Sequence, residues 1–173
     1  MAGRCQLGIG SLNAAVRRRP ERVGMNKTGA IRADLHQDEG HQPRIGIVIV
    51  AHGGLAHEYL AAVEHVVGQQ AGIRTIAIDA NCDRGAKQAE ICDAADSVDS
   101  GNGVVVVVDM FGGSPSNLSM MACRPHDRRI LYGANLPLLI KLAKCRHKPL
   151  SDAVDAATEA GRKYIDSQNL STH

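Results

Sequence analysis

Two apolar runs rich in β-branched residues constrain the fold of this chain more than any other feature. Residues 45–50 read Ile-Gly-Ile-Val-Ile-Val, and residues 104–108 are all valine. Uninterrupted apolar runs of this length are typical of strands buried on both faces, as in a parallel sheet covered by helices. The two runs therefore predict central strands of a sheet that carries helices on both sides.

Two further strands and a series of helices are predicted around these runs. Residues 73–78 and 129–131 have strand composition, and apolar residues at helical spacing follow each predicted strand. The first predicted helix has Leu55, Tyr59, Val63 and Val66 on one face and is closed by Gly68, and the second has Ala86, Ala89, Cys92, Ala95 and Val98. A third helix starts near Ser116, and Pro137 opens a fourth. Ser151 caps the last one, with Val154, Ala157, Gly161, Tyr164 and Ile165 on one face. This alternation predicts an open, mainly parallel α/β sheet of strand order 2-1-3-4 in a three-layer α/β/α architecture.

Composition argues against two classes of function. The formal net charge is +2, and the basic residues are partly concentrated in the first 44 positions, so the rest of the chain lacks the positive field of a nucleic-acid binder. No apolar stretch approaches the length needed to span a bilayer. The cysteines lack CxxC spacing and are odd in number, which predicts free thiols in a reducing compartment: Cys5, Cys82, Cys92, Cys123 and Cys145.

The chain divides into three parts by pattern. Residues 1–43 contain a basic run and scattered polar residues with little apolar periodicity, which predicts a mobile N-terminal extension. A start codon assigned upstream of Met25, an added leader and a genuine tail all account for it equally well. Residues 44–168 form the predicted domain, and residues 169–173 are a short tail.

Polar residues stand directly after the predicted strands, where open α/β sheets bind ligands. They are His52, Asp79, Asp109 and, slightly later, Asn135. With strand order 2-1-3-4, His52 and Asp109 face each other at the ends of neighbouring strands. A carboxylate that accepts a hydrogen bond from one imidazole N–H fixes the tautomer and leaves the other nitrogen exposed as a nucleophile.

Glycine-rich loops follow the same two strands and predict an anion site. Gly53 and Gly54 precede one helix, and Gly112, Gly113 and Ser114 precede another. Glycine lets the backbone approach an anion, and N–H groups at a helix start stabilise its charge. Phosphoryl binding is therefore predicted at Gly53, Gly112, Gly113 and Ser114, with the Ser114 hydroxyl as a donor. Neither loop matches a P-loop or a GxGxxG fingerprint.

Other interpretations of these residues stay open at this point. A histidine after a strand is more often a structural hydrogen-bonding residue, and Gly-Gly pairs are often simple turns. A zinc site of His52, His57 and a carboxylate lacks the usual spacing, and Ser114 lacks the GxSxG elbow of a hydrolase nucleophile. Arg124, Arg128 and Arg129 form either ordinary surface charge or a docking patch for an acidic partner.

Three motifs together resemble a known family. They are Ile-Val-Ile-Val-Ala-His-Gly at 47–53, Val-Val-Asp-Met-Phe-Gly-Gly-Ser-Pro-Ser-Asn at 107–117 and Gly-Ala-Asn-Leu-Pro-Leu-Leu at 133–139. In this order and spacing they resemble the enzyme IIA domain of the mannose family of the bacterial phosphoenolpyruvate-dependent sugar phosphotransferase system. The resemblance covers residues from about 44 to 165, nearly the whole predicted domain.

The resemblance implies a role for each motif residue. His52 would be the phosphorylated histidine, reacting through Nε2, with Asp109 as its partner and Ser114 in contact with the phosphoryl group. Asn135 and Pro137 would shape the end of the fourth strand. Leu55, Met110 and Phe111 would form an apolar rim for transient docking.

The resemblance also implies partners and a location. HPr would be the phosphoryl donor and a IIB protein the acceptor, with no metal, nucleotide or other cofactor. A cytoplasmic homodimer is expected, related to the membrane only through IIC and IID proteins, and a chain that stops at His173 would be a stand-alone IIA. Sugar uptake and a regulatory phospho-relay remain alternatives, as does a phosphate- or nucleotide-binding module in which His52 is never phosphorylated.

Overall fold

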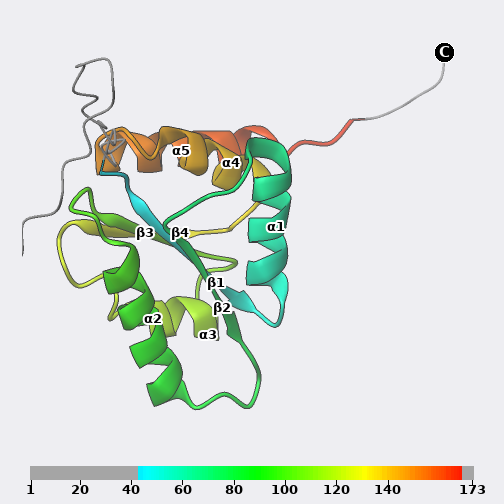
Figure 1. The fold of residues 1–173 in the computed structure, drawn as a ribbon. Coiled ribbons are helices and arrows are strands. Elements are labelled where there is room, and N and C mark those ends of the chain that lie inside the picture. Colours follow the sequence, from blue (N-terminus) through cyan, green and yellow to red (C-terminus); the bar gives the residue numbers. More distant parts are fainter. Residues whose placement is uncertain (1–42, 169–173) are drawn as a thin grey trace, which may run out of the picture. The chain divides into compact units, whose positions relative to one another are not determined.

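A four-stranded parallel sheet forms the centre of the domain. The computed structural model describes residues 43–168, so the predicted extension up to residue 42 and the tail from 169 lie outside the described residues. The strands are β1 (Gly46–His52), β2 (Ile73–Ile78), β3 (Val104–Val108) and β4 (Arg128–Tyr132), in the order β2-β1-β3-β4 (Figure 1). The predicted strand order and parallel pairing are confirmed.

Helices cover both faces of this sheet, as predicted. They are α1 (Leu55–Val67), α2 (Arg84–Val98), α3 (Ser114–Ser119), α4 (Leu136–Cys145) and α5 (Leu150–Lys163). The helices α1, α4 and α5 pack on one face, while α2 and α3 pack on the other (Figure 1). Between successive strands the chain crosses back along a helix, so all four strands run in the same direction. Their four carboxyl ends therefore lie along one edge of the sheet.

The two central strands explain the uninterrupted apolar runs. In β1, Ile47 and Ile49 contact the layer of α1, α4 and α5, whereas Val48 and Val50 contact the layer of α2 and α3. All five valines of β3 are completely inaccessible to solvent. Because both faces are covered, every position of these strands except the terminal His52 is buried and apolar, and the sequence shows no alternation.

The buried face of α2 differs from the predicted stripe. Ile91, Ala95 and Val98 are buried, whereas Ala86 and Ala89 are exposed. The helix therefore contacts the sheet through its second half, where Ile91 supplies the largest apolar surface. Alanine has too small a side chain to reveal which face of a helix is buried, so the predicted stripe was wrong at Ala86 and Ala89 and right at Ala95 and Val98.

Two predictions at helix ends were also wrong. The helix α5 begins at Leu150 after Pro149, and Ser151 lies inside its first turn with its hydroxyl donating to Asp152. Tyr164 and Ile165 follow the helix and are 67% and 77% exposed, so they do not continue its buried face. The helix α3 begins at Ser114, within two residues of the start that was predicted near Ser116.

The cysteines of the described residues are free thiols: Cys82, Cys92, Cys123 and Cys145. Burial raises the pKa of the Cys123 thiol to about 11, which keeps it protonated and unreactive at neutral pH. The remaining cysteine, Cys5, lies outside the described residues. Within residues 43–168, no helix is long and apolar enough to cross a membrane.

Candidate functional site

His52 and Asp109 meet at the carboxyl edge of the sheet. His52 is the last residue of β1, Asp109 directly follows the neighbouring β3, and the two strands run parallel in register. The Asp109 Oδ2 atom accepts a hydrogen bond from the His52 backbone amide at 3.0 Å and lies 2.8 Å from His52 Nδ1. With a carboxylate as acceptor, Nδ1 carries the proton and Nε2 keeps the free lone pair.

Exposure and charge differ sharply between these two side chains. The His52 side chain is 48% exposed, whereas that of Asp109 is 11% exposed. Burial alone would raise the pKa of the Asp109 carboxyl, but hydrogen bonds from the His52 amide and imidazole and from the Met110 amide hold that pKa below its ordinary value. A carboxylate that is ionised at neutral pH therefore lies behind an accessible imidazole.

The backbone of the loop between β3 and α3 packs closely against this imidazole. Gly112 adopts a left-handed conformation with φ of +80°, and its amide donates to the Ser116 hydroxyl at 3.0 Å. The same hydroxyl donates to the Gly113 carbonyl at 3.1 Å, which fixes the loop from both sides. A Cβ atom on Gly113 would lie only 3.1 Å from His52 Cε1 and 3.5 Å from Nε2. The lack of a side chain at position 113 thus keeps the reactive edge of the ring open.

Ser116 was not predicted as a site residue. A serine at the third position of a helix, two residues after Ser114, can reach back to the loop that starts the helix, and this pattern was the available signal. Among residues 43–168, the amides of Gly113 and Ser114 have no hydrogen-bond acceptor, so both remain available to an anion.

Gly53 makes the turn from β1 into α1. It has a φ of +52°, which favours glycine, and its amide donates to the Ile78 carbonyl at 3.1 Å. That hydrogen bond ties the end of β1 to the end of β2. Gly53 lines the site through its backbone, with its N–H already engaged.

A cleft of about 360 Å³ opens beside His52 between three strand ends. His52 and Gly53 line it from the end of β1, and Ser114 lines it from the start of α3. The segment that follows β2 supplies the remaining side: Ile78, Asp79, Ala80, Cys82 and Arg84. Of these, only Asp79 had been identified from its position after a strand.

Three large apolar side chains are exposed on the segments that follow β1 and β3. Leu55, Met110 and Phe111 are 40%, 53% and 72% exposed. The Phe111 ring stands edge-on to Tyr132, with the ring centroids 4.9 Å apart. Large apolar side chains held at this exposure are typical of surfaces that contact other proteins.

Asn135 has a structural role at the end of the fourth strand. Its Oδ1 caps α4 by accepting from the Leu138 amide at 3.0 Å, and its Nδ2 donates to the Gly161 carbonyl of α5 at 3.3 Å. Pro137 occupies the first turn of α4, where its missing N–H leaves no hydrogen bond unmade.

The alternative readings of other residues gain no support. His57 Nδ1 pairs with the Thr75 hydroxyl at 2.7 Å, and the described residues contain no cluster of three or more potential metal ligands. Arg128, 9% exposed, forms ion pairs with Asp96 and Asp99 and is therefore not available for docking.

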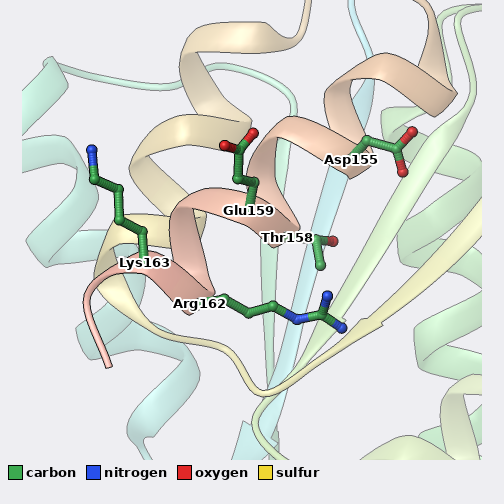
Figure 2. A pocket seen from close by; sticks show the side chains of 5 residues that line it. All are labelled: Asp155, Thr158, Glu159, Arg162 and Lys163. Atoms are coloured by element: carbon green, nitrogen blue, oxygen red, sulfur yellow. The ribbon is translucent and has the colours of Figure 1, made fainter. Parts of the chain in front are cut away.

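A larger depression lies elsewhere, along α5 (Figure 2). Its volume is about 480 Å³, and all its lining residues come from this one helix: Asp155, Thr158, Glu159, Arg162 and Lys163. It contains no residue from the strand ends. The cleft beside His52, where three elements converge, is therefore the better candidate site.

Known proteins share both the sequence pattern and the fold. Residues 46–159 match the family described as EIIA-man, PTS system fructose IIA component. The chain is 29% identical over 125 residues to YadI of Escherichia coli K12, whose name gives it as a IIA component of a phosphotransferase enzyme; the match covers 71% of this chain and 86% of YadI. It is 28% identical over 124 residues to the PTS system mannose-specific EIIAB component of the same strain, covering 70% of this chain but 38% of that protein.

Solved structures share the fold. The mannose/sorbose specific IIA subunit of Enterococcus faecalis superposes with a TM-score of 0.66 at 24% identity, covering 75% of this chain and 98% of that one. A phosphotransferase system component EIIA from Streptococcus agalactiae superposes with a TM-score of 0.64 at 24% identity, covering 71% and 96%. With the family match extending over residues 46–159, the chain belongs to the mannose family of phosphotransferase-system IIA components.

Proposed function

We propose that the chain is a phosphocarrier that accepts a phosphoryl group from phospho-HPr on His52 and passes it to a IIB partner for sugar uptake. The observation that carries this proposal is the 2.8 Å contact between His52 Nδ1 and Asp109, which leaves Nε2 at the open edge of the ring. Exchange with HPr would place the chain in the cytoplasm.

The transfer is an in-line displacement at phosphorus. The Nε2 lone pair of His52 forms the new P–N bond while the bond to the donor histidine breaks, and the donor nitrogen keeps that electron pair. The proton on His52 Nδ1 stays on the ring and remains hydrogen-bonded to Asp109. The negative charge of Asp109 stabilises the positive charge that the ring gains. Asp109 thus both orients the imidazole and favours the phosphorylated state.

The loop before α3 supplies donors for the phosphoryl oxygens. Ser114 lines the cleft together with His52, and Gly113 lies against the His52 ring. Among residues 43–168, the amides of both residues have no acceptor, and the Ser114 hydroxyl is a third donor. Preorganised donors of this kind stabilise the charge that spreads over the equatorial oxygens during transfer. Leu55, Met110 and Phe111 form the rim on which HPr and IIB dock in turn.

The test is phosphorylation from phosphoenolpyruvate through enzyme I and HPr, followed by intact-mass measurement. Wild type is expected to gain one acid-labile phosphoryl group, and His52→Ala none. His65→Ala serves as the matched control because His65 is exposed on α1 away from the cleft, and it is expected to label normally.

Labelling of His52→Ala would overturn the site assignment. A wild type that a competent donor leaves unlabelled would overturn the carrier function and favour the binding-module alternative. Loss of the label on adding IIB would support transport, whereas a stable label with every IIB tested would favour the regulatory relay. The expected homodimer is checked by the mass in solution.

A further inference from the structure

We propose that Arg84 is a catalytic residue of this transfer, its guanidinium binding the oxygens of the phosphoryl group as it moves on to and off His52. The inference rests on the proposed phosphocarrier function and adds a residue from the start of α2. It is carried by the position of Arg84, by its lack of a protein partner and by the charge of the cleft.

Arg84 lies on the wall of the cleft that contains the proposed acceptor nitrogen. It is the first residue of α2, and it lines this cleft together with His52 and Ser114. Asp83 caps the helix by accepting from the Ala86 amide at 2.9 Å, which fixes the backbone from which the Arg84 side chain extends. The cleft is thus bounded by an imidazole, a hydroxyl and a guanidinium from three separate elements.

The guanidinium of Arg84 differs in its contacts from those of Arg128 and Arg146. Arg128 is held by Asp96 and Asp99, and Arg146 donates to three backbone carbonyls. Within residues 43–168, Arg84 is exposed and makes no ion pair and no side-chain hydrogen bond. Its planar set of N–H donors matches the oxygens of a phosphoryl group and remains available for them.

The charge of the cleft requires a cation. A phosphoryl group brings about two negative charges, and the cleft already has Asp79 on its wall and Asp109 behind His52. Apart from His52, Arg84 is the one basic side chain among the residues that line the cleft. A cation in the first turn of a helix opposes the helix dipole, so helix stability does not account for arginine at this position.

During transfer, Arg84 acts on charge without entering the bond changes. The P–N bond to the donor imidazole breaks, the P–N bond to His52 Nε2 forms, and the donor nitrogen keeps the electron pair. The guanidinium donates hydrogen bonds to the phosphoryl oxygens on the side opposite the Gly113-Ser114 loop and keeps its own protons. It therefore stabilises both the transition state and the phosphorylated carrier.

The test compares Arg84→Gln and Arg84→Lys with Arg74→Gln. Arg74 is exposed in β2 at the amino-terminal end of the strand, opposite the site, so its change removes the same charge without touching the cleft. Rapid-quench transfer from phospho-HPr over a range of HPr concentrations separates kcat from KM. Arg84→Gln is expected to lower kcat about ten- to a hundredfold with little change in KM, Arg84→Lys to recover part of the loss, and Arg74→Gln to behave as wild type.

Phosphorus NMR of the phosphorylated proteins gives a second readout. A guanidinium beside the phosphoryl group favours its doubly charged form, so Arg84→Gln is expected to raise the pKa of the phosphoryl group. An unchanged kcat, an effect confined to KM, or a lower kcat with an unchanged phosphoryl pKa would each overturn the role of Arg84. A wild type that HPr does not phosphorylate would instead reject the phosphocarrier function itself.

Discussion

The Gly113 backbone lies where any other residue would place a carbon atom against the ring of His52. A Cβ atom built there lies 3.1 Å from His52 Cε1 and 3.4 Å from Met110 Cγ. The backbone itself, at φ −81° and ψ 175°, is ordinary extended conformation that alanine adopts without strain. The requirement for glycine at this position thus comes from the imidazole and not from the turn.

Gly113→Ala therefore separates crowding at the site from stability of the fold. It is expected to slow phosphorylation of His52 about tenfold or more, since a small displacement of a reacting group has a large effect on rate. The free energy of unfolding is expected to change by less than about 1 kcal/mol. Rapid-quench labelling measures the rate, and urea denaturation measures the stability. A folded variant with wild-type rates would show that the absence of a side chain at position 113 does not matter for the transfer.

At the same scale, the reliable part of the site prediction was the pairing of His52 with Asp109. Both residues directly follow strands that the sequence marks clearly, so the strand order alone brings them together. The contact of Ser116 with the loop and the position of Arg84 on the cleft wall were not predicted, for a physical reason. Their placement depends on how a loop folds back and on where a helix begins, and neither is encoded in apolar periodicity.

Among the elements, α4 is anchored to the sheet by one buried cation. Arg146 follows α4 and is 5% exposed, with Nε donating to the Ile45 carbonyl at 2.6 Å. Its Nη1 donates to Ala71 at 2.6 Å and its Nη2 to Gly72 at 3.1 Å. One side chain thus joins the end of α4 to the start of β1 and to the turn before β2.

Arg146→Met is expected to lower the free energy of unfolding by about 2–3 kcal/mol, because three carbonyls lose a charged donor. Lys144→Met is the matched control: Lys144 is exposed in the last turn of α4, and its loss is expected to change stability by less than about 0.5 kcal/mol. Urea unfolding followed by circular dichroism measures both. Equal effects of the two changes would show that the buried hydrogen bonds contribute little.

Element prediction was complete in the central strands and partly right in α2 and α5. The runs in β1 and β3 were located because Ile and Val bury much area on both faces. In α2, the predicted stripe was right for Ala95 and Val98, whereas Ala86 and Ala89 are exposed and the buried Ile91 was not included. In α5, the contact surface is made by small residues such as Ala157 and Gly161, the latter allowing close approach of Leu138 from α4.

For the molecule as a whole, the parallel sheet concentrates polar chemistry at one edge. Helices cover both faces of the sheet (Figure 1). Polar side chains that follow the buried strands therefore become accessible at the carboxyl ends of those strands. Asp109 stands at this boundary, fixed by hydrogen bonds from the amides of His52 and Met110. Its ionisation state is therefore coupled to the stability of the fold.

That coupling predicts how acid affects the molecule. The pKa of Asp109 is lower in the folded chain than its ordinary value of about 3.9 in an unfolded one. Between these two values the unfolded chain binds more protons, so stability falls as the pH falls. The contribution of Asp109 is fully present above the unfolded pKa and is lost as the pH drops through the folded pKa.

Asp109→Asn removes this ionisation and keeps the size of the side chain. The difference in unfolding free energy between wild type and Asp109→Asn is expected to be constant above about pH 5 and to shrink as the pH is lowered below about 4. Urea unfolding from pH 3 to pH 7 measures it, with Asp155→Asn, exposed on α5, as the control for losing a carboxylate. A difference that stays flat down to pH 3 would mean that the hydrogen bonds to Asp109 do not favour its ionised form. In that case the carboxylate would not hold the His52 tautomer in the way that phosphoryl transfer through Nε2 requires.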